Sequence, residues 1–159
     1  MLRYIDLIFA QHLLQEIRVD DPKNRIDMSL EDIEIVLSRH WASNLNTPVF
    51  LVDSVGNLIF INEAAEPLLG FRFAEIGEIG AEFWATAFSI TDERGDPIPA
   101  EEQPLAIALS QQKPAHRKFN AIGLDGIKRE IEATCFPLIN SEGHFFGVAA
   151  MFWHIESAD

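Results

Sequence analysis

The N-terminal part of the chain carries apolar residues at helical spacing. Between Met1 and Val19 they recur every three or four positions and would form one stripe of an amphipathic helix, at Leu2, Ile5, Phe9, Leu13 and Ile17. A second helix is expected from Ser29 to Ala42, because Ser29 and Asp32 have the spacing of a capping box. Neither helix is apolar enough to be stable alone in water, so each is expected to cover a partner surface.

From Thr47 onward the pattern changes to short runs of strand-forming residues. The first two, Pro48–Asp53 and Asn57–Ile61, flank a DSVGN turn, and the last three are Ala115–Gly123, Ile127–Ile139 and His144–Glu156. Between them we expect a helix with Asn62 as its N-cap and Gly70 at its end, an ambiguous segment Ala74–Ser89, the loop TDERGDPIP and a helix Ala100–Gln112. This order predicts an α+β fold: a five-stranded antiparallel sheet with helices gathered on one face.

Alternation along these strands separates an inner face of the sheet from an outer one. In Ile127–Ile139, for example, Ile131 and Ala133 point one way while Glu130 and Glu132 point the other. Because the inner wall is apolar and several members are small, either helix side chains fill the space behind it or an apolar ligand does. The expected pocket residues are Phe50, Val52, Phe83, Trp84, Phe88, Phe119, Ala121, Ile131, Ala133, Cys135, Val148, Ala150 and Phe152.

The outer face of the sheet is also apolar where the first and last strands run. Leu51, Met151 and Trp153 fall on it, and a sheet that is wet on one side would carry polar residues there. We therefore expect the N-terminal helices to cap this face and to build a homodimer; a cap within one chain is the alternative. In domain terms, residues 1–45 are a helical cap and dimerisation segment, and residues 46–156 form the second domain.

Composition and charge narrow the classes of function. The chain has 159 residues, a net charge of −13 and one cysteine, Cys135. The negative charge argues against nucleic-acid and anionic-membrane binding, and the single thiol favours a reducing, cytoplasmic compartment. The five histidines have no metal-ligand spacing, and no nucleophile elbow or phosphate-binding loop occurs. We expect a chain without catalytic chemistry.

Three stretches of the sequence, in the right order, resemble a PAS domain. VFLVDSVGNLIFINEAAEPLLGF is similar to the opening strand–turn–strand–helix unit, and GDPIPAEEQPLAIALSQQKP to the stretch before and within the helix that precedes the third strand. LDGIKREIEATCFPLINSEGHFFGVAAMFWHI looks like the closing three-stranded meander. The resemblance covers residues 46–156 and implies a sensory or regulatory module, in which a pocket holds a ligand and shifts of strands or flanking helices pass the signal on.

The resemblance also bears on cofactors. Haem-binding relatives carry a ligating histidine on the helix before the third strand, and Ala100–Gln112 has none. Photochemical flavin sensors use a cysteine in the middle segment, which is absent here. Haem and photochemical flavin are therefore disfavoured, and the ligand, the signal and the downstream effector stay unidentified. The sequence predicts a sensing module, with a ligand-free dimerisation scaffold as the alternative and a small enzyme using Cys135 as the third possibility.

Overall fold

A computed structural model describes residues 29–155; residues 1–28 and 156–159 are not described. The expected helix Met1–Val19, with Leu2, Ile5, Phe9, Leu13 and Ile17, thus lies outside the described residues. The strands are β1 (Val49–Asp53), β2 (Leu58–Ile61), β3 (Ser89–Thr91), β4 (Ala115–Ile122), β5 (Lys128–Ile139) and β6 (Phe145–His154). The helices are α2 (Leu30–Ser43), α3 (Glu66–Leu69), α4 (Phe73–Ile76), α5 (Ala81–Thr86), the 3₁₀ turn η1 (Ala100–Glu102) and α6 (Pro104–Gln111).

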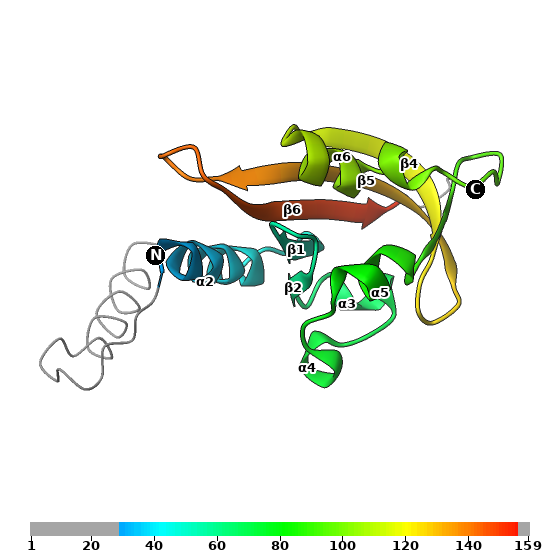
Figure 1. Cartoon of the computed structure of the whole chain (residues 1–159). Coiled ribbons are helices and arrows are strands. Elements are labelled where there is room, and N and C mark those ends of the chain that lie inside the picture. The colour runs from blue at the N-terminus through cyan, green and yellow to red at the C-terminus, as the bar shows by residue number, and fades with distance from the viewer. Residues whose placement is uncertain (1–28, 156–159) are drawn as a thin grey trace, which may run out of the picture.

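One antiparallel sheet organises the fold, in the order β2-β1-β6-β5-β4-β3 (Figure 1). The five strands expected from the sequence all form, so the α+β class is correct, but the count of five is wrong. The sixth strand, β3, is an edge strand of three residues that pairs Ile90 with Ala121 of β4. A run this short shows no alternation, which is why the sequence pattern did not reveal it.

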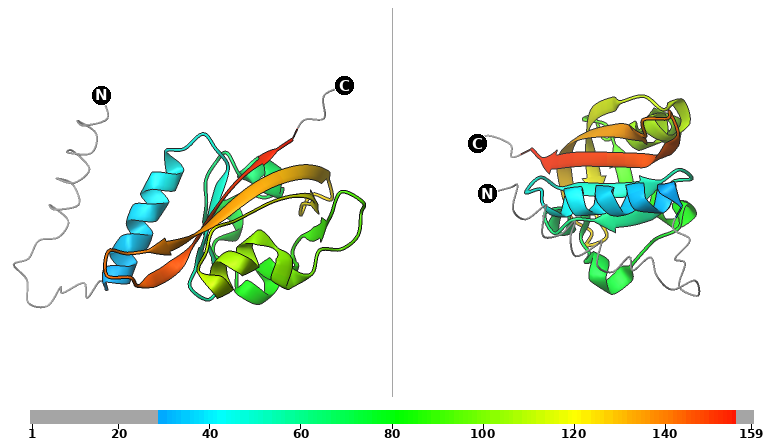
Figure 2. Two further views of the ribbon diagram at one scale, coloured as in Figure 1. Left: turned by 90° about the horizontal axis from the view of Figure 1, so that it is seen from above. Right: turned by 90° about the vertical axis from the view of Figure 1, so that its left-hand side faces the viewer.

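Helices cover both faces of the sheet. In the left view of Figure 2, α2 lies on one side while α3, α5 and α6 lie on the other. On the α2 side, an outer cluster of buried residues joins the helix to the strands: Ala42, Val49, Leu51, Ile59 and Ala149. The expectation that the helix beginning at Ser29 caps the outer face is confirmed, since Leu51 is fully buried there.

The two ends of α2 are held by different side chains. At the N-terminus the expected capping box forms: the Asp32 amide donates to Ser29 Oγ (3.2 Å), and the Ser29 amide donates to Asp32 Oδ2 (2.9 Å). At the other end the Ala42 carbonyl accepts from Asn62 Nδ2 (3.1 Å). A side chain from β2's end thus satisfies part of the C-terminal turn of α2.

This contact corrects the expected role of Asn62. No helix starts directly after it; α3 begins at Glu66, and its N-cap position is Ala65. Asn62 Oδ1 does accept from the Ala65 amide (3.1 Å), but it also accepts from the Val49 amide of β1 (2.9 Å). The residue is a buried junction between strands and helices rather than the cap of one helix. The expected helix Ala100–Gln112 is also shorter, because the α-helix starts at Pro104. Proline is well tolerated in the first turn of a helix, where its missing N–H would have no partner in the helix.

The tip of the β4–β5 hairpin is tied to α3 and sets the distance between that helix and the sheet. The Leu124 amide donates to the Leu69 carbonyl (3.1 Å), and Gly70, at φ +82°, lies so close that a Cβ there would meet Asp125. Within the tip, Arg129 and Asp125 form an ion pair at 2.7 Å. The hydrogen bond from Arg129 lowers the pKa of Asp125 to about 2.

Candidate ligand cavity

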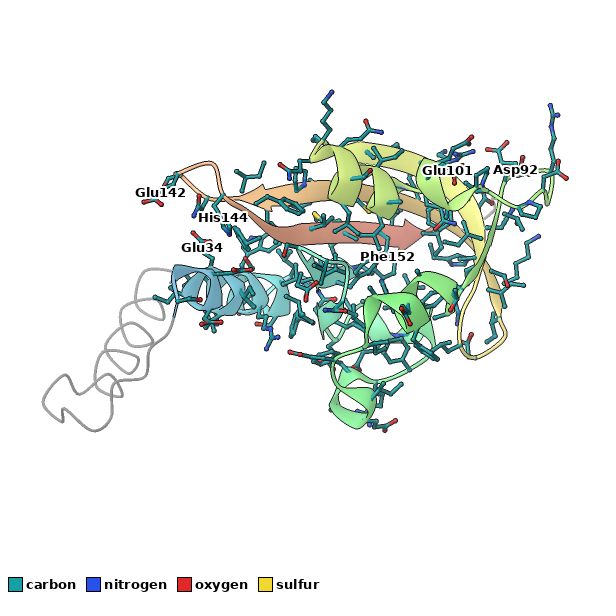
Figure 3. The ribbon with its side chains drawn as sticks, viewed as in Figure 1. Glu34, Asp92, Glu101, Glu142, His144 and Phe152 are labelled. Atoms are coloured by element: carbon teal, nitrogen blue, oxygen red, sulfur yellow. The ribbon has the colours of Figure 1, made fainter. Side chains whose placement is uncertain are left out.

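The inner face of the sheet and its helices enclose an apolar cavity of about 120 Å³. Ten of the expected pocket residues line it: Phe50, Trp84, Phe88, Phe119, Ala121, Ile131, Ala133, Cys135, Ala150 and Phe152. They come from β1, α5 and its C-terminal flank, β4, β5 and β6, and Figure 3 shows Phe152 on the side of β6 that faces the helices. Those on the strands lie on the inner face that alternation predicted, and Trp84 and Phe88 belong to the aromatic cluster of α5 and its flank.

Three expected pocket residues do not line the cavity. Val52 and Val148 are fully buried in the same core cluster but away from the empty space. Phe83 is 57% exposed, so its assignment to the pocket is wrong. Neighbouring residues on a helix point about 100° apart, and α5 turns Trp84 inward and Phe83 outward. An aromatic cluster in sequence alone does not tell which ring is buried.

The aromatic part of the lining is braced by ring-to-ring contacts. Trp84 makes T-shaped contacts with Phe50 and Phe88, both with centroids 5.1 Å apart, and a longer one with Phe71 at 6.3 Å. Phe50 also lies against Phe152, at 5.7 Å. Such edge-to-face pairs stabilise one another beyond the area they bury. The rings therefore hold their positions as a wall, and the space beside the small residues Ala133 and Ala150 stays open.

Several lining residues were not among the expected ones. They are Leu68, Leu69, Ala85, Ile90, Gln103, Pro104 and Leu105, from α3, α5, β3 and the start of α6. The inward face of the helix ending at Gly70 was a usable signal for Leu68 and Leu69, whereas nothing local marks Gln103. Ala85 of α5 is the exposed residue among them.

The chemistry of the lining is neutral. Two lining side chains carry a nitrogen or oxygen atom, Trp84 and Gln103, and Gln103 Nε2 donates to the Ile98 carbonyl (3.3 Å). The only titratable group is Cys135, and burial raises the pKa of its thiol to about 12. The cavity therefore offers dispersion contacts and aromatic edges, and no charge to pair with a charged ligand.

Haem and flavin do not fit this lining. The residues that surround the cavity include no histidine to ligate iron, and a single amide to meet a flavin ring edge. Cys135 does face the cavity, but from β5 and as a protonated thiol. Ligand pockets in proteins typically occupy about 300–1,000 Å³, and the cavity of about 120 Å³ here is too small for groups as large as haem or flavin.

The outer face leaves some apolar side chains uncovered. Leu51 and Met151 belong to the cluster beneath α2, whereas Trp153 is 39% exposed and donates its indole N–H to Glu132 Oε2 (3.0 Å). The expectation that Trp153 is covered is therefore not met by this chain's described residues. On α2 itself, Leu37 and Trp41 are 55% and 43% exposed, one turn apart on its solvent side.

An antiparallel sheet in this strand order, with short helices enclosing a cavity on one face, is the PAS fold. Among solved structures, the PAS domain of BvgS from Bordetella pertussis matches with a TM-score of 0.53 at 15% identity, covering 78% of this chain and 87% of that one. A PAS domain from Colwellia psychrerythraea matches at 0.54 and 18%, covering 76% and 97%, and a Rhodobacter sphaeroides LOV protein at 0.61 and 10%, covering 78% and 68%. No protein-family model and no curated protein matches the chain.

These likenesses fix the fold and confirm the resemblance seen in the three sequence stretches. Two other findings concern only the part of the chain from residue 29 to residue 155. No helix there is long and apolar enough to cross a bilayer. No group of three or more metal-ligating side chains occurs there either.

Proposed function

We propose that this chain is a non-catalytic sensory or regulatory module whose core cavity binds a small, neutral, apolar molecule. The observation that carries the proposal is the cavity itself, which is lined almost entirely by carbon. Well-packed cores leave few voids larger than a water molecule, so a space of this size beside a braced aromatic wall needs an explanation. An apolar cavity stays dry, and an apolar ligand gains the dispersion contacts that the wall lacks.

The size of the cavity limits the ligand. An engineered apolar cavity of about 150 Å³ in another protein binds benzene, and the cavity of about 120 Å³ here is of similar size. We therefore place the ligand in the class of single-ring aromatics or short-chain hydrocarbons. Catalysis is not part of the proposal, because Cys135 is held as a thiol and a thiol is a poor nucleophile.

Benzene is the probe that tests this function. Titration should move the methyl NMR resonances of Leu68, Leu69 and Ile131 and raise the thermal midpoint, since a ligand that binds only the folded state stabilises it. Ala133→Leu should remove binding by filling the space. Ala106→Leu on α6, a half-buried position that does not line the cavity, is the matched control and should leave binding intact. Benzene binding that survives Ala133→Leu, or no binding at all, would contradict the proposal.

We propose that the signal is passed on through a homodimer formed by α2. Leu37 and Trp41, together with Ile33 and Val36, give this helix an exposed apolar stripe opposite the face that covers the sheet. The same stripe supports the alternative, a ligand-free dimerisation scaffold. In either case the partner is a second copy of the chain. The single cysteine, Cys135, supports placing the module in a reducing compartment such as the cytoplasm.

Light scattering after gel filtration tests the dimer. Leu37→Glu should shift the mass to that of one chain, because a charge cannot be buried unpaired in an apolar contact. Val55→Glu is the matched control: Val55 is 71% exposed in the β1–β2 turn and away from the stripe. A wild-type chain of monomer mass would exclude the dimer, and benzene binding by such a monomer would leave the sensing function standing. A dimer that binds no benzene would favour the scaffold.

A further inference from the structure

Asn62 is the point where α2, β1 and the cavity wall meet. Its Oδ1 accepts from the amides of Val49 (2.9 Å) and Ala65 (3.1 Å). Its Nδ2 lies within hydrogen-bond distance of three carbonyls, those of Thr47 (2.8 Å), Ala42 (3.1 Å) and Leu45 (3.2 Å). One side chain therefore joins a helix on the outer face of the sheet to elements on the inner face.

The hydrogen-bonding capacity of this amide is fully used. An asparagine has two lone pairs and two N–H groups, and here two donors and three acceptors surround it, so one N–H is shared between carbonyls. Asn62 is 1% exposed and is the one fully buried polar side chain between residues 29 and 155. Water cannot replace a lost partner at this depth, so a movement of any neighbouring element costs hydrogen bonds.

Asn62 Nδ2 bonds the part of the chain that attaches α2 to the sheet. The Ala42 carbonyl belongs to the last turn of the helix, and the Leu45 and Thr47 carbonyls belong to the segment that leads into β1. Apolar contacts of Ile35 and Ala42 with the outer cluster complete the docking. Hydrogen bonds are directional, so the bonds from Nδ2 fix the position of the C-terminal end of α2 relative to β1 more closely than apolar contacts alone would.

Asn62 Oδ1 bonds two residues next to the wall of the cavity, Val49 and Ala65. The Ala65 carbonyl accepts from the amides of Leu68 and Leu69 (both 3.1 Å), and both leucines line the cavity. Val49, the other residue bonded to Oδ1, precedes Phe50, which lines the cavity from β1. The two residues whose amides donate to Asn62 Oδ1 are therefore close to the cavity lining. Val49 directly precedes Phe50, and Ala65 lies one helical turn before Leu68 and Leu69.

We infer that Asn62 couples occupancy of the cavity to the docking of α2: a ligand that holds the α3 and β1 walls in place keeps the five hydrogen bonds of Asn62 intact, and an empty cavity lets the end of α2 open more often. This inference rests on the proposed ligand-sensing function. It names the physical connection by which that site would be read on the opposite face of the sheet. In the terms of linkage, α2 docking and ligand binding stabilise each other by the same factor.

Hydrogen exchange of the amides of residues 40–46, in the last turn of α2 and just after it, measures the coupling directly. With benzene at ten times its dissociation constant, exchange through an opening that expels the ligand slows by about elevenfold at most. We expect a slowing of several-fold at residues 40–46 in the wild type. Ala133→Leu, which fills the cavity covalently, should slow the same amides without benzene.

Two position-specific variants separate coupling from simple stability. Asn62→Asp keeps the acceptor for Val49 and Ala65 but loses the donors to α2, so benzene should still bind and no longer slow exchange at residues 40–46. Asn44→Asp is the matched control: Asn44 donates to the His40 carbonyl (2.7 Å) at the same helix end but is exposed and not bonded to the cavity wall. Its benzene response should equal that of the wild type. If Asn62→Asp does not fold, Asn62→Ser, too short to reach the α2 carbonyls, takes its place.

The outcomes distinguish this inference from the proposed function. If benzene moves the cavity resonances but exchange at residues 40–46 is unchanged in the wild type, the coupling is overturned and the sensing cavity stands. If benzene does not bind, the proposed function fails, and Ala133→Leu alone decides the coupling: slowed exchange supports it and unchanged exchange overturns it. A benzene response that persists in Asn62→Asp, or in Asn62→Ser, also overturns it.

Discussion

Removing the Asn62 side chain should be among the most damaging single changes in this domain. In Asn62→Ala the amides of Val49 and Ala65 and the carbonyls of Ala42, Leu45 and Thr47 all lose a partner. Two of them keep another: the Ala65 amide still bonds the Asn62 carbonyl (3.0 Å), and the Ala42 carbonyl still accepts from the Leu45 amide (3.2 Å). The Val49 amide and the Leu45 and Thr47 carbonyls are left without this bond, and each unsatisfied group costs about 1–3 kcal/mol.

The expected loss is therefore about 3–9 kcal/mol, against a total stability of about 5–15 kcal/mol for a domain of this kind. Urea unfolding followed by tryptophan fluorescence measures it, and a lower midpoint with an unchanged slope assigns the loss to the folded state. Asn44→Ala, which removes an exposed side-chain bond that water replaces, should cost less than about 0.5 kcal/mol. If the two alanine variants have the same midpoint, the buried amide does not stabilise the fold as described.

Three further outcomes are expected. Gly147→Ala should cost about 1–3 kcal/mol, because a Cβ at that position would meet the β1 backbone, whereas Gly80→Ala, with open space around it, should be neutral; thermal midpoints compare them. Native Cys135 should react with a thiol reagent at pH 8 far more slowly than the unfolded chain, because its pKa of about 12 leaves about a thousandfold fewer thiolates than a pKa of 9.0, and equal rates would disprove burial. The stability that Asp125 gains from Arg129 is present above about pH 4 and is lost as the pH falls toward 2, so Asp125→Asn should flatten the thermal midpoint across that interval, and parallel profiles would refute the pair.

The sequence was informative where structure repeats at short range. In β5 the alternation of Ile131 and Ala133 with Glu130 and Glu132 predicted which side chains face the cavity, and Ile131 and Ala133 line it. The capping box of Ser29 and Asp32 likewise predicted where α2 begins. Both features depend on residues at most four positions apart, which is the range over which strand and helix geometry acts.

The errors came where the deciding partner is distant in sequence. Asn62 precedes a helical run and so has the pattern of an N-cap, but the carbonyls that bind its Nδ2 lie 15 to 20 residues earlier in the chain. Phe83 and Trp84 are equivalent in sequence, and only the placement of α5 against β1 buries the second of them. The volume of the cavity could not be predicted either, because its lining comes from strands and helices that are far apart in the sequence.

The strand order has a consequence for how the chain reaches its native state. The first strand, β1, and the last, β6, pair side by side in the middle of the sheet, with Val49 opposite Met151. Until residues 145–154 have left the ribosome, β6 cannot join the pair β2–β1 to the group β5–β4–β3. Folding of this domain therefore requires β6, and a chain that lacks residues 145–154 would expose the unpaired edges of β1 and β5 to pairing with other chains.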